Sequence, residues 1–147
     1  FGVNITYIMQ GEPMGLAHAA KTAEDFVDGD SFVMYLGDNI LKSGIEEFVS
    51  GFDESDFASR LLLQEVDDPR QFGVAELNED GKIINLVEKP ENPKSNLALV
   101  GIYLFKNNIF VFGVMYFSNT SLVNLKSLAL SVSINTGTAF TNFIISG

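Results

Sequence analysis

Apolar residues near the start of the chain fall into runs whose spacing changes from a strand pattern to a helix pattern and back. Residues 5–9 and 32–36 are short runs rich in β-branched and aromatic side chains, whereas residues 16–27 repeat apolar positions at helical spacing. Between them, Glu12-Pro13-Met14-Gly15 contains the proline and glycine of a turn. The pattern therefore predicts a βαβ unit.

The middle of the chain predicts further strands, two of which form a hairpin around the turn Asn78-Glu79-Asp80-Gly81. The last of these strands is a buried run around Gly101. The expected elements are, in order, a helix at 45–52 and strands at 59–66, 72–77, 82–87 and 97–105. We expect an α/β domain whose sheet is mixed and mostly parallel, with the hairpin as an insertion.

The last quarter of the chain has a different pattern. Of the 9 basic and 19 acidic residues, only Lys126 lies beyond Phe110. Apolar side chains are mixed there with Ser, Asn and Thr and follow neither the strand nor the helix period. We therefore predict a partial domain at 1–110 and an aberrant apolar tail of uncertain fold at 111–147, for which a changed reading frame is one possible origin.

Composition narrows the class of protein. A chain of 147 residues suits one domain, and the lack of cysteine excludes disulfides and thiolate metal sites. The formal charge of −10 disfavours a nucleic-acid duplex or an anionic membrane as partner. No uncharged apolar run reaches the roughly 20 residues of a spanning helix, and the first residues lack a signal-peptide pattern, so we expect a cytoplasmic protein.

Asp38 is the first candidate for chemistry. It directly follows the apolar run 32–36, and ligands of open α/β sheets bind beyond the carboxyl ends of the strands. A carboxylate at that place can hold a divalent cation against phosphate oxygens. The competing interpretation is a turn cap, because Gly37-Asp38-Asn39 is also good turn chemistry.

Five short motifs, one of which contains Asp38, resemble those of one enzyme family. Their order and spacing are similar to those of the sugar-1-phosphate nucleotidyltransferases, most closely the glucose-1-phosphate thymidylyltransferases, over residues 5–110. The resemblance implies a Rossmann-like nucleotidyltransferase domain, incomplete at its amino end. The motifs are Gln10-x-x-Pro13-x-Gly15-Leu16-Ala17-x-Ala19, Leu36-Gly37-Asp38-Asn39, Asp68-Pro69-x-x-Phe72-Gly73-Val74, Glu88-Lys89-Pro90 and Val100-Gly101-x-Tyr103.

The resemblance also implies a reaction and its partners. A sugar 1-phosphate oxygen attacks the α-phosphorus of a nucleoside triphosphate in line and expels pyrophosphate; dTTP and glucose 1-phosphate are the expected pair. Asp38 would hold the Mg²⁺ cofactor and Lys89 would grip the sugar phosphate. Relatives of this kind commonly form homo-oligomers, so a homo-oligomer is one expected assembly.

Six further residues are expected to bind substrate by the same resemblance. Gln10, whose amide can donate and accept, and Gly15, which has no Cβ, match the site of the pyrimidine base. Phe72, Gly73, Glu88 and Val100 match the sugar pocket, where Phe72 replaces a common tyrosine.

Plainer interpretations remain open for several residues. Gly73 and Gly101 are also suited to a bulge or close packing, and Lys89 to a solvated strand end. His18, where the family often has glutamine, is interpreted as a packed or partly exposed helix residue without a catalytic role.

Departures from the family pattern leave alternatives for the function. The 147 residues contain neither a G-x-G-T-R loop nor a Trp-x-Asp-Thr-Gly segment. Asn135-Thr136-Gly137-Thr138 resembles the second of these only superficially. We therefore expect the isolated chain to be nearly inactive. The alternatives are a non-catalytic remnant that binds a sugar nucleotide or nothing, and a UTP-dependent uridylyltransferase. A generic dinucleotide binder is disfavoured because no G-x-G-x-x-G follows a strand.

Overall fold

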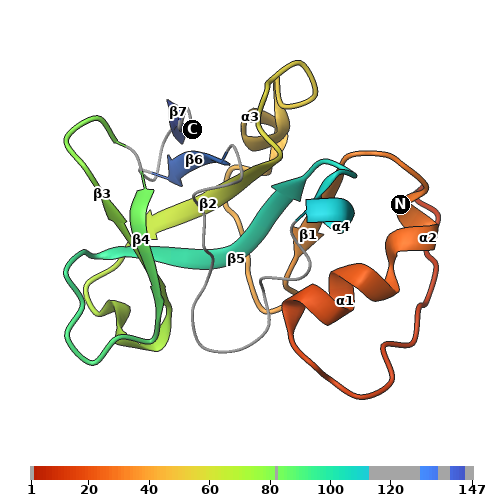
Figure 1. Cartoon of the computed structure of the whole chain (residues 1–147), viewed down its shortest axis with the longest axis horizontal. Helices are drawn as coiled ribbons and strands as arrows, with labels where there is room; N and C mark the ends of the chain where they lie inside the picture. Colours follow the sequence, from red (N-terminus) through yellow and green to blue (C-terminus); the bar gives the residue numbers. More distant parts are fainter. Residues whose placement is uncertain (1, 82, 113–129, 136–139, 145–147) are drawn as a thin grey trace.

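The computed structural model describes residues 2–81, 83–112, 130–135 and 140–144, with side chains up to Phe110. Its strands form one sheet in the order β4-β3-β5-β2-β6-β7, and β1 pairs with β5 (Figure 1). The strands are β1 Phe32–Tyr35, β2 Ser59–Glu65, β3 Gly73–Leu77, β4 Ile83–Glu88, β5 Leu97–Phe105, β6 Leu130–Asn135 and β7 Phe140–Ile144. The helices are α1 Leu16–Thr22, α2 Glu24–Val27, α3 Glu46–Val49 and α4 Ile109–Phe112, and a 3₁₀ turn, η1, covers Pro69–Gln71.

The α/β class is confirmed, but the strand directions differ from the expectation. Among the described strands only β2 and β6 pair in parallel, whereas β5 runs antiparallel to β1, β2 and β3. The β3–β4 hairpin is antiparallel because its tight turn permits nothing else. Hydrophobic runs reveal that a strand is buried but carry no information on its direction, so the mostly parallel sheet was a wrong expectation for this part of the chain.

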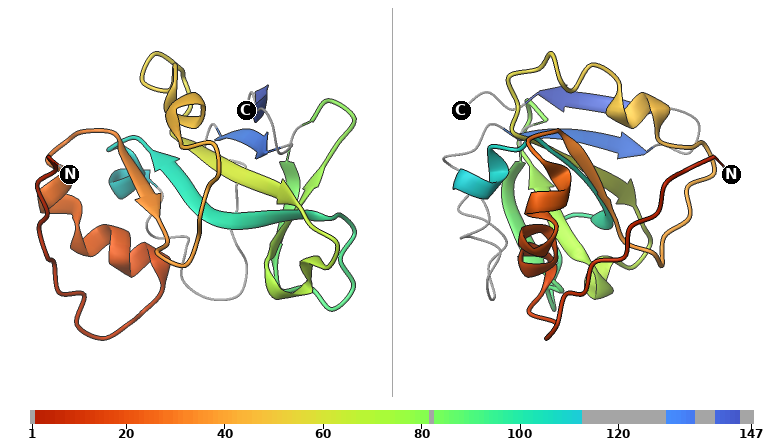
Figure 2. Two further views of the ribbon diagram at one scale, coloured as in Figure 1. Left: turned by 180° about the vertical axis from the view of Figure 1, so that it is seen from behind. Right: turned by 90° about the vertical axis from the view of Figure 1, so that its right-hand side faces the viewer.

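The predicted strand at residues 5–9 is also wrong. The segment makes no strand pairing with any described residue, and Ile5, Tyr7 and Met9 are 69%, 91% and 88% exposed. Figure 2 shows it, in dark red, passing around the outside of α1 and α2. A strand needs a neighbour for its backbone N–H and C=O groups, and an apolar run alone does not provide one.

The predicted helix at 16–27 is divided in two at Ala23. α1 ends at Thr22, whose Oγ1 donates to the carbonyl oxygen of His18 at 2.8 Å, and α2 ends at Val27, followed by Asp28 in a left-handed conformation with φ 47°. A threonine hydroxyl that binds the preceding turn competes with the helix ladder and weakens it there. The helix predicted at 45–52 is shorter than expected, whereas the strand at 97–105 has the predicted bounds.

Two apolar clusters lie on the two faces of the sheet. The first is covered by α1 and α4, and its buried members are Leu61, Leu63, Ala75, Leu86, Leu99, Tyr103, Phe105 and Ile109. The second is covered by α3, and its buried members are Phe48, Phe52, Leu62, Ile102 and Leu104. Alternate residues of β2 and β5 therefore supply both cores, as the two-residue period of a strand requires.

Arg60 attaches α3 to the sheet. The residue is only 7% exposed, and its Nη1 donates to the carbonyl oxygens of Phe48 at 2.7 Å and Ser50 at 3.0 Å. The guanidinium also lies 5.4 Å from the ring centre of Phe52, and burial lowers the pKa of Arg60 from its ordinary value. The side chain thus satisfies carbonyl groups that the end of α3 leaves without helix partners.

Arg60→Ala is expected to lower the free energy of unfolding by about 2–4 kcal/mol, because carbonyl oxygens lose their donor and packing over Phe52 is lost. Lys94→Ala is the control, since the side chain of Lys94 is 76% exposed, and its effect should stay within about 0.5 kcal/mol. Urea titration followed by circular dichroism measures both. Equal effects of the two substitutions would contradict the role of Arg60.

The sheet continues beyond residue 110, since β6 pairs with β2 from Ser59↔Leu130 to Gln64↔Asn135. Residues 113–129 and 136–139 lie outside the described part of the chain. Three residues of the segment Asn135-Thr136-Gly137-Thr138 are among them. The proposed division at 110 and the aberrant tail therefore stay predictions. In the described residues, no helix has the length and apolar character needed to cross a membrane.

Candidate functional site

A break in one edge of β5 brings several predicted site segments together. β2 occupies one edge of β5, and β1 and β3 share the other. Pairing with β3 ends at Ala98 and pairing with β1 begins at Ile102, so residues 99–101 face the space between these two strands. Figure 1 shows β1 toward one end of β5 and the β3–β4 hairpin toward the other. The carboxyl end of β1 and the amino end of β3 therefore meet beside Val100.

The segment that carries Asp38 is fixed against this break by Gly101. The backbone N–H of Leu36 donates to the carbonyl oxygen of Gly101 at 2.9 Å. Gly101 has φ +71°, and a Cβ there would lie 2.7 Å from Leu36 Cδ1 and 2.9 Å from Asn39 Nδ2. Only glycine combines this backbone conformation with so close a contact. Two predicted motifs, Leu36–Asn39 and the segment around Gly101, are thus packed on each other.

Asp38 itself is exposed at the carboxyl end of β1. Asn39 Nδ2 donates to Asp38 Oδ1 at 3.0 Å, which orients the carboxylate and leaves Oδ2 available. In the described residues, no three His, Asp or Glu side chains gather into a preformed metal site. A single carboxylate nevertheless suits Mg²⁺, which keeps several waters and is usually held by one or two carboxylates together with substrate phosphates.

The β3–β4 hairpin presents Phe72, Gly73, Glu88 and Lys89 on the other side of the break. Gly73 is paired with Glu88, and the backbone N–H of Lys89 donates to the carbonyl oxygen of Phe72 at 2.9 Å. Lys89 has φ +44°, a left-handed conformation that is costly for a residue with a Cβ. Asp28, after α2, has a similar φ of +47°, so this conformation alone does not establish a role, and the role of Lys89 stays a prediction.

The turn that leads into Phe72 is held by Asp68. Its Oδ1 accepts from the backbone N–H of Arg70 at 3.2 Å and from Arg70 Nε at 2.8 Å, and Oδ2 accepts from Nη2 at 2.7 Å. These hydrogen bonds from Arg70 lower the pKa of Asp68 to about 2, so the carboxylate stays charged and caps η1 at neutral pH. The family-like motif from Asp68 to Gly73 is therefore a structural turn that positions the hairpin.

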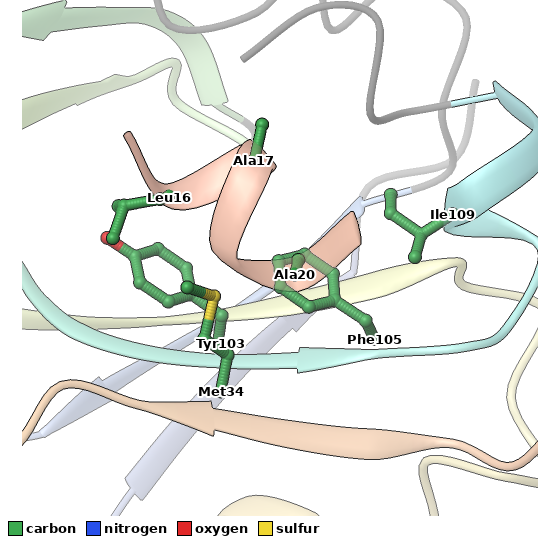
Figure 3. A pocket seen from close by; sticks show the side chains of 7 residues that line it. All are labelled: Leu16, Ala17, Ala20, Met34, Tyr103, Phe105 and Ile109. Carbon is green, nitrogen blue, oxygen red and sulfur yellow. The ribbon is translucent and has the colours of Figure 1, made fainter. Parts of the chain in front are cut away.

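Tyr103 connects the hairpin to α1. Burial raises the pKa of Tyr103 to about 12, and the negative charge of Glu88 adds to the shift, so the phenol keeps its proton at neutral pH. Figure 3 shows Tyr103 and Met34 projecting from the sheet toward Leu16 of α1. The gap that they line is apolar and holds only about 10 Å³, so it is a packing defect and not a substrate pocket.

A larger cavity lies beside the break. Its volume is about 370 Å³, which falls in the range of small-molecule pockets. Its lining mixes polar and apolar side chains and includes Val100 and Asn39, the neighbour of Asp38. The lining residues are Asn39, Ile40, Leu41, Lys42, Ser43, Gln64, Val100 and Ile102. Space for a ligand therefore exists next to two of the predicted segments.

Gln10 and Gly15 lie together at the amino end of α1. Gln10 Nε2 lies 3.4 Å from the carbonyl oxygen of Gly15 and 3.1 Å from His18 Nδ1. Gly15 has φ +89° with nothing within 4 Å of a hypothetical Cβ, so its surface is open to a ligand. In the described part of the chain, no hydrogen bond or ion pair joins this pair to Asp38 or Lys89.

Sequence reasoning missed the contacts of His18 and the charge that Glu88 exerts on Tyr103. The contact of His18 with Gln10 joins residues 8 positions apart across a turn, which no period reveals. The placement of His18 on the first turn after Gly15 was the only available signal.

Comparisons with known proteins identify the family of the chain. A family model described as nucleotidyl transferase matches residues 1–130. The chain is 54% identical over 110 residues to the low-salt glycan biosynthesis nucleotidyltransferase Agl11 of Haloferax volcanii, covering 75% of this chain and 31% of that protein. It is also 54% identical over 106 residues to a glucose-1-phosphate thymidylyltransferase of Streptomyces antibioticus, covering 71% of this chain and 30% of the relative.

A solved structure gives the same relationship in three dimensions. The crystal structure of a candidate glucose-1-phosphate thymidylyltransferase from Bacillus anthracis, in complex with sucrose, superposes with a TM-score of 0.71 at 43% identity. The match covers 76% of this chain and 45% of that one. The chain thus spans less than half the length of these three proteins. It belongs to the nucleotidyl transferase family, among the sugar-1-phosphate nucleotidyltransferases.

Proposed function

We propose that the chain forms the sugar-nucleotide pocket of a glucose-1-phosphate thymidylyltransferase. The observation that carries the proposal is the break in the edge of β5, where the segments of Asp38, Gly73, Glu88 and Lys89 converge on Val100. In the proposed reaction, an oxygen of glucose 1-phosphate attacks the α-phosphorus of dTTP. The bond from that phosphorus to the bridging oxygen breaks, and pyrophosphate leaves with the electron pair.

Each residue has a defined part in this scheme. The ammonium of Lys89 binds the sugar phosphate, and Glu88 accepts hydrogen bonds from sugar hydroxyls beside the backbone of Gly73 and Val100. Phe72 packs on the sugar without the hydroxyl contact that a tyrosine would add. Charge neutralisation is the main requirement when two anions are brought together, and the ammonium of an exposed lysine can supply it.

The base would lie on the open surface of Gly15, with the amide of Gln10 at its hydrogen-bonding edge. Mg²⁺, held by Asp38 and substrate phosphates, would stabilise the charge that develops on the phosphate oxygens. Asn39 supports this role because its donor orients the carboxylate. We expect a cytoplasmic location, where nucleoside triphosphates are available.

UTP is the alternative nucleotide. Thymine and uracil have the same hydrogen-bonding edge and differ in the methyl group of thymine, so an amide at that edge does not by itself distinguish them. A UTP–glucose-1-phosphate uridylyltransferase of Haloferax volcanii is 42% identical to the chain over 111 residues.

Pyrophosphate release with Mg²⁺, glucose 1-phosphate and either dTTP or UTP tests the reaction. Faster release with dTTP supports thymidylyl transfer, and faster release with UTP favours the uridylyltransferase. No release with either triphosphate, from a chain that is folded, is the result expected if the missing segments make the isolated chain nearly inactive, and it would favour the non-catalytic alternative.

Asp38→Asn tests the metal site separately, because it keeps the shape of the side chain and removes its charge. We expect Mg²⁺ to strengthen the binding of dTDP-glucose to the unsubstituted chain by roughly 10-fold, and to have no effect on the variant. Asp25→Asn, which removes an exposed charge on α2, is the matched control and should keep the Mg²⁺ effect. An Mg²⁺ effect that survives in Asp38→Asn would contradict this assignment.

A further inference from the structure

His18 makes a contact that the proposed function does not yet use. It is the single histidine of the chain, it is half-buried, and it lies on the first turn of α1. Its Nδ1 is 3.1 Å from Nε2 of Gln10, the residue proposed to meet the base. The same amide nitrogen lies 3.4 Å from the carbonyl oxygen of Gly15.

The carbonyl group of Gly15 fixes which way the Gln10 amide faces. A carbonyl oxygen only accepts hydrogen bonds, so the amide atom directed at it must be the nitrogen. If the amide were reversed, two oxygens would face each other with no proton between them. The orientation is therefore determined by the chemistry of Gly15.

The orientation of the amide in turn determines the state of the imidazole. Because Gln10 Nε2 carries only donors, His18 Nδ1 must be the unprotonated ring nitrogen and accept the hydrogen bond. The ring proton is then on Nε2. Together the two acceptors hold the amide nitrogen against the start of α1, and in the described part of the chain no protein group donates to Gln10 Oε1.

We infer that His18 is a positioning residue that holds the Gln10 amide with its oxygen toward the base and so selects the pyrimidine. This inference rests on the proposed function. The oxygen accepts a hydrogen bond from the N3–H group that thymine and uracil share. Cytosine has an acceptor at N3, so the same oxygen would face a lone pair and disfavour it.

Nitrogen-15 NMR of the imidazole tests the contact without any ligand. The single histidine makes the assignment unambiguous. We expect the proton on Nε2 and expect the Nδ1 resonance to shift when Gln10→Leu removes the donor. A proton on Nδ1, or an Nδ1 resonance that does not respond to Gln10→Leu, would overturn the inference whether or not the chain binds nucleotides.

Titration calorimetry with dTDP-glucose and CDP-glucose tests the consequence. His18→Leu should lower the ratio of the two affinities by about 10-fold, because the amide is then free to turn either face to the base. His18→Gln, which keeps an acceptor on the same turn, should restore most of the preference. Thr22→Val, which removes another hydrogen bond of α1, is the control and should leave the ratio unchanged.

The ratio separates positioning from folding, since loss of folded protein weakens both ligands equally. An unchanged ratio in His18→Leu would refute the selection of the base. If the unsubstituted chain binds neither ligand, the proposed function fails and the selection fails with it, while the NMR result still decides whether His18 orients Gln10.

Discussion

Replacing Lys89 with glycine is expected to weaken the binding of dTDP-glucose by about 10- to 100-fold without destabilising the fold. The proposed contact is a charge-assisted hydrogen bond to the phosphate next to the sugar, and such contacts contribute about 1.5–3 kcal/mol. Lys89 has φ +44°, a conformation that glycine adopts without the cost of a Cβ. The free energy of unfolding should therefore stay the same or rise by up to about 1 kcal/mol.

Weaker binding without a loss of stability distinguishes a functional lysine from a structural one. Titration calorimetry should show weaker binding of dTDP-glucose and little change for dTMP, which lacks the phosphate that carries glucose. Lys94→Gly removes a charge that is 76% exposed and should leave both affinities unchanged. If Lys89→Gly binds dTDP-glucose as tightly as the unsubstituted chain, Lys89 does not bind the sugar phosphate.

Gly101→Ala is expected to damage both the fold and the metal site. The substitution forces a Cβ into a left-handed conformation, which costs about 1–2 kcal/mol, and directs it at Leu36 and Asn39 at less than 3.0 Å. Because Asn39 orients the carboxylate of Asp38, its displacement should also reduce the effect of Mg²⁺ on binding. We expect a total destabilisation of about 2–4 kcal/mol.

Gly51→Ala separates backbone strain from contact. Gly51 has φ +65°, close to that of Gly101, but nothing lies within 4 Å of its hypothetical Cβ. It should therefore cost only the backbone part, about 1–2 kcal/mol, and keep the Mg²⁺ effect. Denaturant titration and calorimetry measure both variants. Similar losses in the two, with Mg²⁺ sensitivity intact, would show that Gly101 does not support Asp38.

The sequence predicted those elements whose cause is local. The hairpin around Asn78–Gly81 follows from turn chemistry, and the strand at 97–105 follows from an apolar run that is buried on both faces. Residues 5–9 have a similar apolar composition but lie exposed, because pairing depends on a partner elsewhere in the chain. Strand direction was misjudged for the same reason.

The candidate site was likewise predictable only in part. Motif order pointed to Asp38, Gly73, Glu88, Lys89 and Val100 together, and the structure brings their segments to one break in the sheet, although their roles stay predictions. The strain at Lys89 and the bond between His18 and Gln10 arise from three-dimensional contacts, which residue spacing does not encode. His18 was consequently interpreted as a packed or partly exposed helix residue without a catalytic role.

The central claim is that Asp38, Lys89 and the residues around the β5 break form one sugar-nucleotide pocket. Titration of the 147-residue chain with dTDP-glucose and Mg²⁺ tests it most directly, with circular dichroism to establish that each variant is folded. The account predicts saturable binding at one site that both Asp38→Ala and Lys89→Ala weaken. Absence of binding by the folded, unsubstituted chain would contradict it.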